Sequence, residues 1–274
     1  MKPGGRYRPD ATAWAVMALS AAGEKQNDLK SARSRLAASQ MNNGCIPLSP
    51  DHPEAIWPTP LAVLAWKDSH EFESIREKAT DFLLKTTGRH WPNKTGDPVS
   101  HDTALKGWPW ISNTHSWVEP TALAVIALRA TGYENHSRTR EAVAMLVDRQ
   151  LPNGGWNYGN RIVFGKELHP MPETTGMALS AVAGLIPESP VERSLDYLQN
   201  YMNSAQTPLT IGWGFLGLGA FGRYPAIARN RLLDCLGRQE RYGMYDTTAL
   251  SLLILAMFTN RGLINIYKES DASL

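Results

Sequence analysis

The chain has 274 residues, of which 43% are hydrophobic, and its 28 basic and 26 acidic residues leave a formal net charge of +2. Charges of both signs are interspersed, so we expect no nucleic-acid partner, whereas weak attraction to an anionic membrane surface stays open. This length fits one large domain or two ordinary ones and is enough to bury a sizeable core.

Cysteine usage and the apolar runs narrow the class of protein further. Cys45 and Cys235 are the only cysteines and lie far apart, which predicts neither a disulfide framework nor a thiolate zinc site. The start, Met1–Arg6, is polar, and no apolar run reaches the ~20 residues that span a bilayer. We therefore expect a cytoplasmic protein without metal or cofactor, and leave surface attachment to a membrane open.

The first predicted helix opens at Asp10-Ala-Thr12-Ala, and the same register returns along the chain. The threonines of the five copies are Thr12, Thr59, Thr121, Thr175 and Thr248. Two residues before them stand Asp10, Trp57, Glu119, Glu173 and Asp246, and three residues after them stand Ala15, Ala62, Ala124, Ala178 and Ser251. Small residues at one helical position let neighbouring helices approach closely, so the copies predict equivalent helices packed side by side.

Segments with a different pattern separate these runs. They alternate charged with apolar residues at spacings of three and four, which is typical of amphipathic helices with one wet face. These predicted outer helices are Leu29–Gln40, Glu71–Thr87, Ser137–Gln150, Pro190–Asn203 and Tyr224–Glu240.

The runs that begin with Thr are apolar nearly all round, which predicts inner helices buried on every side or facing a cavity. We predict a sixth inner helix at Leu209–Phe221, although its four glycines weaken helix propensity. The fold class is therefore all-α, with about six inner and five to six outer helices in a single domain over residues 1–274.

Three long connectors are rich in Gly, Pro, Asn and Trp: Gly44–Pro58, Gly88–Val118 and Pro152–Pro172. Loops this long in a helical domain are usually functional or disordered, and their aromatic content argues against disorder. Strand signals are few, and the short candidate Arg161–Phe164 lies inside a connector.

The four acids at predicted inner-helix starts have two explanations. Negative charge is stabilised at a helix N-terminus, so Asp10, Glu119, Glu173 and Asp246 are explained by capping alone. Parallel inner helices would also bring these carboxylates together at the mouth of one apolar cavity, which capping does not require.

Inner helices that begin acid-x-Thr-Ala and alternate with amphipathic outer helices resemble the α/α toroid of terpenoid cyclases and protein prenyltransferase β subunits. Gln150-Leu-Pro-Asn-Gly-Gly-Trp156 resembles the Gln/Trp (QW) repeat motif of squalene and hopene cyclases, and Gln40–Ile46 resembles a second copy with Ile in place of Trp. The resemblance covers nearly the whole chain and implies a single α/α toroid. It says more about fold than about reaction.

The resemblance also suggests chemistry. Class II cyclases use an Asp-x-Asp-Asp-Thr-Ala motif whose middle Asp protonates an alkene or epoxide, and in Arg8-Pro-Asp10-Ala-Thr12-Ala13 only that middle Asp remains. Prenyltransferases bind zinc through Asp, Cys and His. Here Asp246 stands at the position of the zinc His and no Asp-x-Cys pair occurs, so zinc-dependent thiol prenylation is not predicted.

If the protein is catalytic, we expect acid-initiated cyclisation or isomerisation of the terpene cyclase type, with Asp10, Glu119, Glu173 or Asp246 as proton donor and His115 as an acid/base partner of Glu119. Aromatic faces would bind substrate and stabilise a carbocation. The predicted wall is Trp14, Trp57, Trp110, Trp117, Trp156, Tyr158, Trp213 and Tyr245. Arg161, Lys166 and His169 could meet a diphosphate or carboxylate, or form an ordinary solvated loop.

Three functions stay open. The first is a toroid that holds a long apolar ligand, an isoprenoid, in a central cavity. The second is a non-catalytic binding or partner module on a degenerate cyclase toroid, for which a plugged centre with an exposed aromatic rim would argue. The third is a carbohydrate-active α/α barrel, for which paired carboxylates in a polar cleft would argue.

Overall fold

The structure, a computed structural model, describes residues 6–94 and 99–266, so most of the polar start predicted at Met1–Arg6 lies outside the described residues. The chain is mostly helical, which confirms the all-α prediction. The one short strand candidate is also confirmed, because β1 (Ile162–Val163) pairs antiparallel with β2 (Lys166–Glu167) inside a connector.

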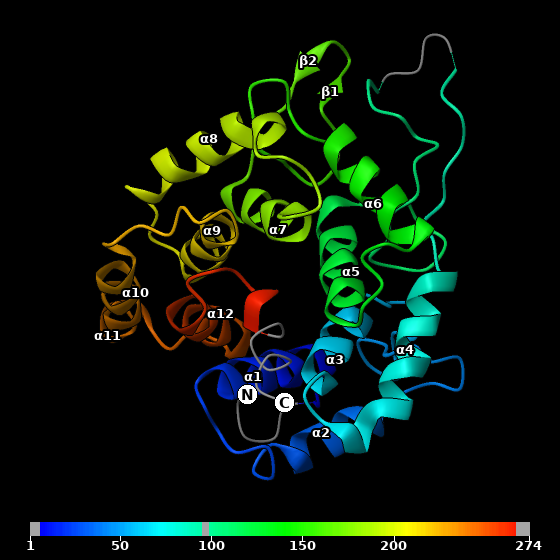
Figure 1. The fold of residues 1–274 in the computed structure, drawn as a ribbon, viewed down its shortest axis with the longest axis vertical. Coiled ribbons are helices and arrows are strands. Elements are labelled where there is room, and N and C mark those ends of the chain that lie inside the picture. The colour runs from blue at the N-terminus through cyan, green and yellow to red at the C-terminus, as the bar shows by residue number, and fades with distance from the viewer. Residues whose placement is uncertain (1–5, 95–98, 267–274) are drawn as a thin grey trace.

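All six predicted inner helices form. They are α1 (Pro9–Ala21), α3 (Pro58–Trp66), α5 (Val118–Ala130), α7 (Pro172–Val182), α9 (Pro208–Ala220) and α12 (Thr247–Phe258). Their packing follows chain order from α1 through α3, α5, α7, α9 and α12, and α12 packs back against α1 (Figure 1). Every residue of α3 is buried, as its uniformly apolar sequence predicts.

The predicted outer helices form as well. They are α2 (Lys30–Ala37), α4 (Glu73–Lys85), α6 (Ser137–Asp148), α8 (Glu192–Met202), and α10 (Ala228–Gly237) with the short α11 (Gln239–Tyr242). Turns of 3₁₀ helix at His70–Phe72 and Ser189–Val191 precede α4 and α8. Helix α10 begins later than the predicted Tyr224, because Pro225 disfavours helical backbone in the residue before it.

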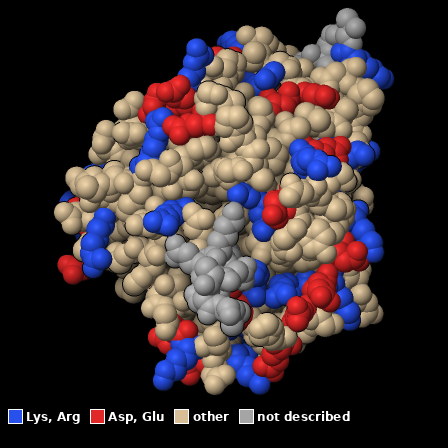
Figure 2. All heavy atoms as spheres, viewed as in Figure 1, with Lys and Arg blue, Asp and Glu red and all other residues tan. Residues whose placement is uncertain are grey.

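Each outer helix lies against an inner one: α2 on α1, α4 on α3, α6 on α5, α8 on α9 and α7, and α10 on α9 and α12. In α8 the buried face consists of Ser194, Leu195, Leu198 and Met202, at the predicted spacing of three and four. Charged residues of both signs are interspersed over the surface that Figure 2 shows.

Helices α5 and α7 run parallel. At the N-terminal ends of α5 and α7, Thr174 donates a hydrogen bond to Glu119. At their C-terminal ends, the Arg129 guanidinium of α5 donates to the carbonyls of Ala181 (2.8 Å) and Ala183 (2.6 Å). The two helices therefore meet start to start and end to end.

Glycine in α9 serves close packing. A Cβ on Gly176 of α7 would lie 2.2 Å from the carbonyl oxygen of Trp213 in α9, and a Cβ on Gly217 would lie 2.7 Å from the Gly176 Cα. The two backbones can touch only where side chains are absent. A Cβ on Gly212 would likewise lie 2.9 Å from the Leu252 side chain of α12, so glycines in α9 admit close neighbours despite their low helix propensity.

The repeated threonine anchors the connector that precedes its helix. In three copies its Oγ1 accepts a hydrogen bond from a connector main-chain N–H. The pairs are Thr59 with Ile46 (3.0 Å), Thr121 with Trp108 (2.9 Å) and Thr175 with Trp156 (2.9 Å). The repeat therefore has a structural purpose at these positions.

The two Gln/Trp-like segments connect successive outer helices. Gln40 Nε2 donates to the Ile75 carbonyl of α4 at 2.9 Å, and Gln150 Nε2 donates to Ser194 Oγ of α8 at 2.7 Å. Both partners are the third residue of their helix, so the two glutamines reach the same helical position, one through a main-chain carbonyl and the other through a side-chain hydroxyl.

Candidate functional site

The four acids occupy two different positions at the inner-helix starts. Asp10, Glu119 and Glu173 lie in the first turn, one residue after the helix begins. Asp246 is the N-cap of α12, and its Oδ1 accepts a hydrogen bond from the Ala249 N–H at 2.8 Å. A capping hydrogen bond therefore explains the position of Asp246 but not the positions of Asp10, Glu119 and Glu173.

Glu119 and Glu173 form one pair. The Glu119 carboxylate accepts from Thr174 Oγ1 at 2.9 Å, and the Glu173 carboxylate accepts from Thr210 Oγ1 at 3.4 Å, each from the next inner helix. Burial raises the pKa of Glu119, the Thr174 hydrogen bond lowers it, and the charge of Glu173 raises it again. The two carboxylates are thus close enough to repel each other.

Asp10 is held by an arginine. Its side chain is buried, with the residue only 3% exposed, and both oxygens accept from Arg8: Nε to Oδ1 at 2.8 Å and Nη2 to Oδ2 at 2.7 Å. The hydrogen bonds to Asp10 raise the pKa of Arg8 against the effect of burial, and the charges of Asp10 and then Asp246 raise it further. The two-pronged contact with Asp10 is therefore the main interaction of the Arg8 guanidinium.

Two tryptophans meet between helices that are not neighbours in the packing order. Trp14 of α1 and Trp213 of α9 are 4% and 1% exposed, and their rings lie edge to face with centroids 5.7 Å apart. Helix α12 packs between α1 and α9, so the contact crosses the interior that the inner helices enclose. The two indole rings therefore pack against each other inside the helical core.

The other predicted wall residues differ in exposure. Trp57 and Trp110 are partly buried and form an edge-to-face pair 5.3 Å apart. Trp117 and Tyr245 are partly buried, and Tyr158 is exposed. Trp156 is fully buried and donates through Nε1 to the Leu146 carbonyl at 2.7 Å, so it anchors α6 and presents no face to a ligand.

A groove of about 710 Å³ lies beside the start of α1. Most of its wall is apolar, from Tyr7, Pro9, Met41, Pro47, Pro50 and Pro53. The Tyr7 hydroxyl is buried, and burial raises its pKa. We call this the N-terminal groove.

A second cavity, of about 230 Å³, lies between the connectors that precede α5 and α7, and we call it the connector cavity. It is lined by Arg89, Trp91, His101, His115, Trp117 and Arg149, among others. Trp91 and His115 lie edge to face with ring centroids 5.0 Å apart. Of the residues predicted from sequence, His115 and Trp117 thus meet here.

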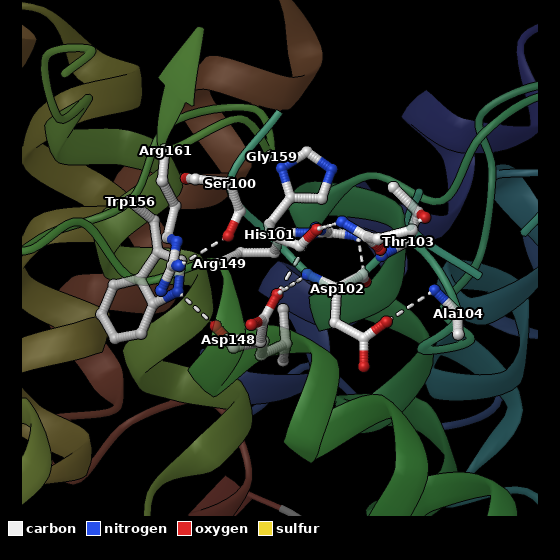
Figure 3. Close-up of polar contacts among 12 residues, drawn as sticks. Ser100, His101, Asp102, Thr103, Ala104, Asp148, Arg149, Trp156, Gly159 and Arg161 are labelled. Atoms are coloured by element: carbon white, nitrogen blue, oxygen red, sulfur yellow. Dashed lines mark hydrogen bonds and ion pairs between the residues drawn. The ribbon is translucent and has the colours of Figure 1, made fainter. Parts of the chain in front are cut away.

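The end of α6 holds one wall of the connector cavity (Figure 3). Asp148 Oδ2 accepts from the Asp102 N–H at 3.0 Å, and Arg149 Nη2 donates to the Asp102 carbonyl at 3.2 Å. Arg149 Nη1 itself lies 3.4 Å from Asp148 Oδ2. Both main-chain polar groups of Asp102 are thereby fixed to α6.

Burial shapes the charges around this wall. It lowers the pKa of Arg149 to about 10, with a further contribution from the like charge of Arg161, and it raises the pKa of Asp148. Arg161 donates to the Ser100 carbonyl at 3.0 Å and so faces the connector, whereas Lys166 and His169 are exposed.

His101, Arg89 and Arg149 were not predicted as site residues. Each is an isolated residue without a motif, and they meet only because the connector folds back onto α6. The unusual length of Gly88–Val118 was the available signal.

Within residues 6–94 and 99–266, no group of three or more His, Cys, Asp or Glu side chains could hold a metal ion. Cys45 and Cys235 are buried free thiols. None of the helices described is long and apolar enough to cross a membrane.

No protein-family model matches the chain, and no curated protein matches it. What the structure defines is a mostly helical protein with inner and outer helices, acids at the starts of four inner helices, and several cavities that include the N-terminal groove and the connector cavity.

Proposed function

We propose that the chain is an α/α toroid of the terpenoid cyclase and prenyltransferase type that binds a long apolar ligand of the isoprenoid class without turning it over. The cyclic order of inner-helix contacts, with α12 packed against α1, supports the toroid. The Gln40 and Gln150 contacts, which reach the same helical position, support its kinship with the Gln/Trp repeats.

The observation that carries ligand binding is the N-terminal groove. Its volume of about 710 Å³ falls in the range of small-molecule sites, and its proline, tyrosine and methionine wall suits an apolar chain. The Trp14 and Trp213 rings occupy part of the interior between α1 and α9, which favours a ligand outside the centre over one inside it.

Asp10 argues against acid catalysis. Both Asp10 oxygens accept hydrogen bonds from the Arg8 guanidinium, so neither oxygen is left free to meet a substrate. The one acid that matches the cyclase motif is therefore neutralised by a salt bridge. A binding protein on a degenerate cyclase toroid fits this arrangement better than a cyclase.

Glu119 favours acid-initiated catalysis as the second candidate. Its raised pKa and its neighbour Glu173 are features of an acid tuned to donate a proton. Thr174 stabilises the ionised form, which works against that role.

Native mass spectrometry of the purified chain, followed by incubation with squalene and with prenyl diphosphates, tests both candidates. We expect an apolar ligand to bind and to be recovered unchanged. Ala38→Trp, on the groove wall, should abolish binding, whereas Ala144→Trp on the exposed face of α6 should not. Formation of a cyclised product that disappears in Glu119→Gln would support the second candidate and contradict the first.

A further inference from the structure

The connector cavity contains a buried polar atom without a partner. His101 is 7% exposed, and its Nδ1 makes no hydrogen bond with any residue that the structure describes. A buried donor or acceptor left unsatisfied costs roughly 1 to 3 kcal/mol, so such atoms usually have a partner. Figure 3 shows the His101 ring directed away from the contacts among Asp102, Asp148 and Arg149.

Two arginines line the same cavity as His101, and a third lies near its wall. Arg149 is buried and uses two of its guanidinium N–H groups for Asp148 and the Asp102 carbonyl. A guanidinium has five such donors, so others remain. Arg89 lines the same cavity and makes no ion pair with the described residues. Arg161 adds a third guanidinium, close enough to depress the pKa of Arg149.

An anion would resolve both features. An oxyanion accepts several hydrogen bonds at once, from guanidinium groups and from an imidazole N–H, and such charge-assisted bonds are about twice as strong as neutral ones. It would also reduce the repulsion between Arg149 and Arg161.

The remaining wall defines the body of the ligand. Trp91 and Trp117 contribute aromatic surface, and Leu105 contributes an aliphatic side chain. The volume of about 230 Å³ is below the usual range for drug-sized ligands. This volume suits a ligand that consists of one ring and one anionic group.

The geometry points to a binding site in the connector cavity for a small oxyanion, a carboxylate or phosphate monoester, carried on a single apolar ring. Arg89, Arg149 and His101 hold the anionic group, and Trp91 and Trp117 contact the ring. This site is separate from the N-terminal groove and does not depend on the apolar ligand bound there.

Isothermal titration calorimetry of the full chain tests the site with three probes: benzoate, phenyl phosphate and the neutral benzyl alcohol. We expect at least one anion to bind, more weakly as salt is added, and the alcohol to bind at least tenfold more weakly. A preference between the anions identifies the class of headgroup. The proposal is overturned if neither anion binds or if the alcohol binds equally well.

Two variants test the named residues. Arg89→Gln should weaken anion binding about tenfold or more, whereas Arg140→Gln, which changes an exposed arginine of α6, should not. His101→Leu should weaken binding similarly and leave the Tm within about 3 °C, because no internal hydrogen bond of its ring is lost. Unchanged affinity in Arg89→Gln, or a Tm loss well beyond that limit in His101→Leu, contradicts the assignment.

Discussion

Trp14 and Trp213 lie edge to face with an interplanar angle of 80°, across the interior enclosed by the inner helices. They come from α1 and α9, which are far apart in sequence and separated by α12 in the packing order. The contact therefore joins two inner helices that do not pack as neighbours.

Replacing either tryptophan should be severely destabilising. We expect Trp14→Ala and Trp213→Ala each to cost about 3 to 5 kcal/mol, because a buried indole leaves a cavity. The double variant should reveal a coupling of about 0.5 to 1.5 kcal/mol from the ring contact. Urea unfolding measures these values, with the exposed Met244→Ala as control. Losses below about 1 kcal/mol would show that the interior is not packed as described.

Gly176 should not tolerate a side chain. A Cβ there would lie 2.2 Å from the Trp213 carbonyl oxygen, so Gly176→Ala must push α7 and α9 apart, at a cost of about 1 to 3 kcal/mol or more. The matched control is Gly237→Ala in α10, where a Cβ meets nothing within 4 Å. That change should be neutral or stabilise by up to about 1 kcal/mol. Equal effects in thermal unfolding would refute close backbone contact.

The repeated threonine should matter only where it holds a connector. Thr121→Val removes the acceptor of the buried Trp108 N–H, so we expect a loss of about 1 to 3 kcal/mol in the free energy of unfolding. Thr12 occupies the same repeat position, but its hydroxyl donates to the exposed Arg8 carbonyl. Thr12→Val should therefore change stability by less than about 0.5 kcal/mol, and chemical denaturation of both variants checks the difference.

Asp246 should behave as a helix cap. Asp246→Ala should cost about 1 kcal/mol, and Asp246→Asn should retain most of that stability, because Asn can also accept the Ala249 N–H. Asp234→Ala on the exposed face of α10 serves as the control. A large loss in the Asn variant would mean that the charge of Asp246, beside Arg8, contributes more than the cap.

The periodicity of apolar and charged residues predicted the helices, because the spacing of these residues along the sequence determines which face of a helix is buried. Even α9 could be recognised, although its four glycines lower helix propensity. The close approach of Gly217 to Gly176 of α7, and of Gly212 to Leu252 of α12, is visible only in the folded chain. The predicted role of Trp156 as a ligand-wall residue was wrong, also because it depends on a distant partner. A tryptophan beside glycine predicts a loop residue. The neighbouring sequence does not indicate that the Leu146 carbonyl accepts a hydrogen bond from the Trp156 indole N–H.

The candidate site was less predictable than the fold. The acids were found from their repeated position. Whether each carboxylate caps a helix, pairs with a base or carries a proton depends on its neighbours in the folded chain, such as Arg8 and Thr174. The connector cavity depends on where Asp102 docks on α6, which sequence spacing does not encode.

Glu119 should make stability depend on pH. Burial and the charge of Glu173 raise its pKa in the folded protein above the ordinary 4.5, so between these two pKa values the folded state binds more protons than the unfolded state. The free energy of unfolding contributed by this group therefore falls as pH rises through that window. Glu119→Gln carries no charge and can still accept from Thr174, so we expect it to raise the Tm above the window and to lose that advantage below the unfolded pKa. Calorimetry from pH 4 to 8, with exposed Glu240→Gln as control, measures the difference. A Tm difference that is constant or grows toward low pH would contradict a raised pKa at Glu119.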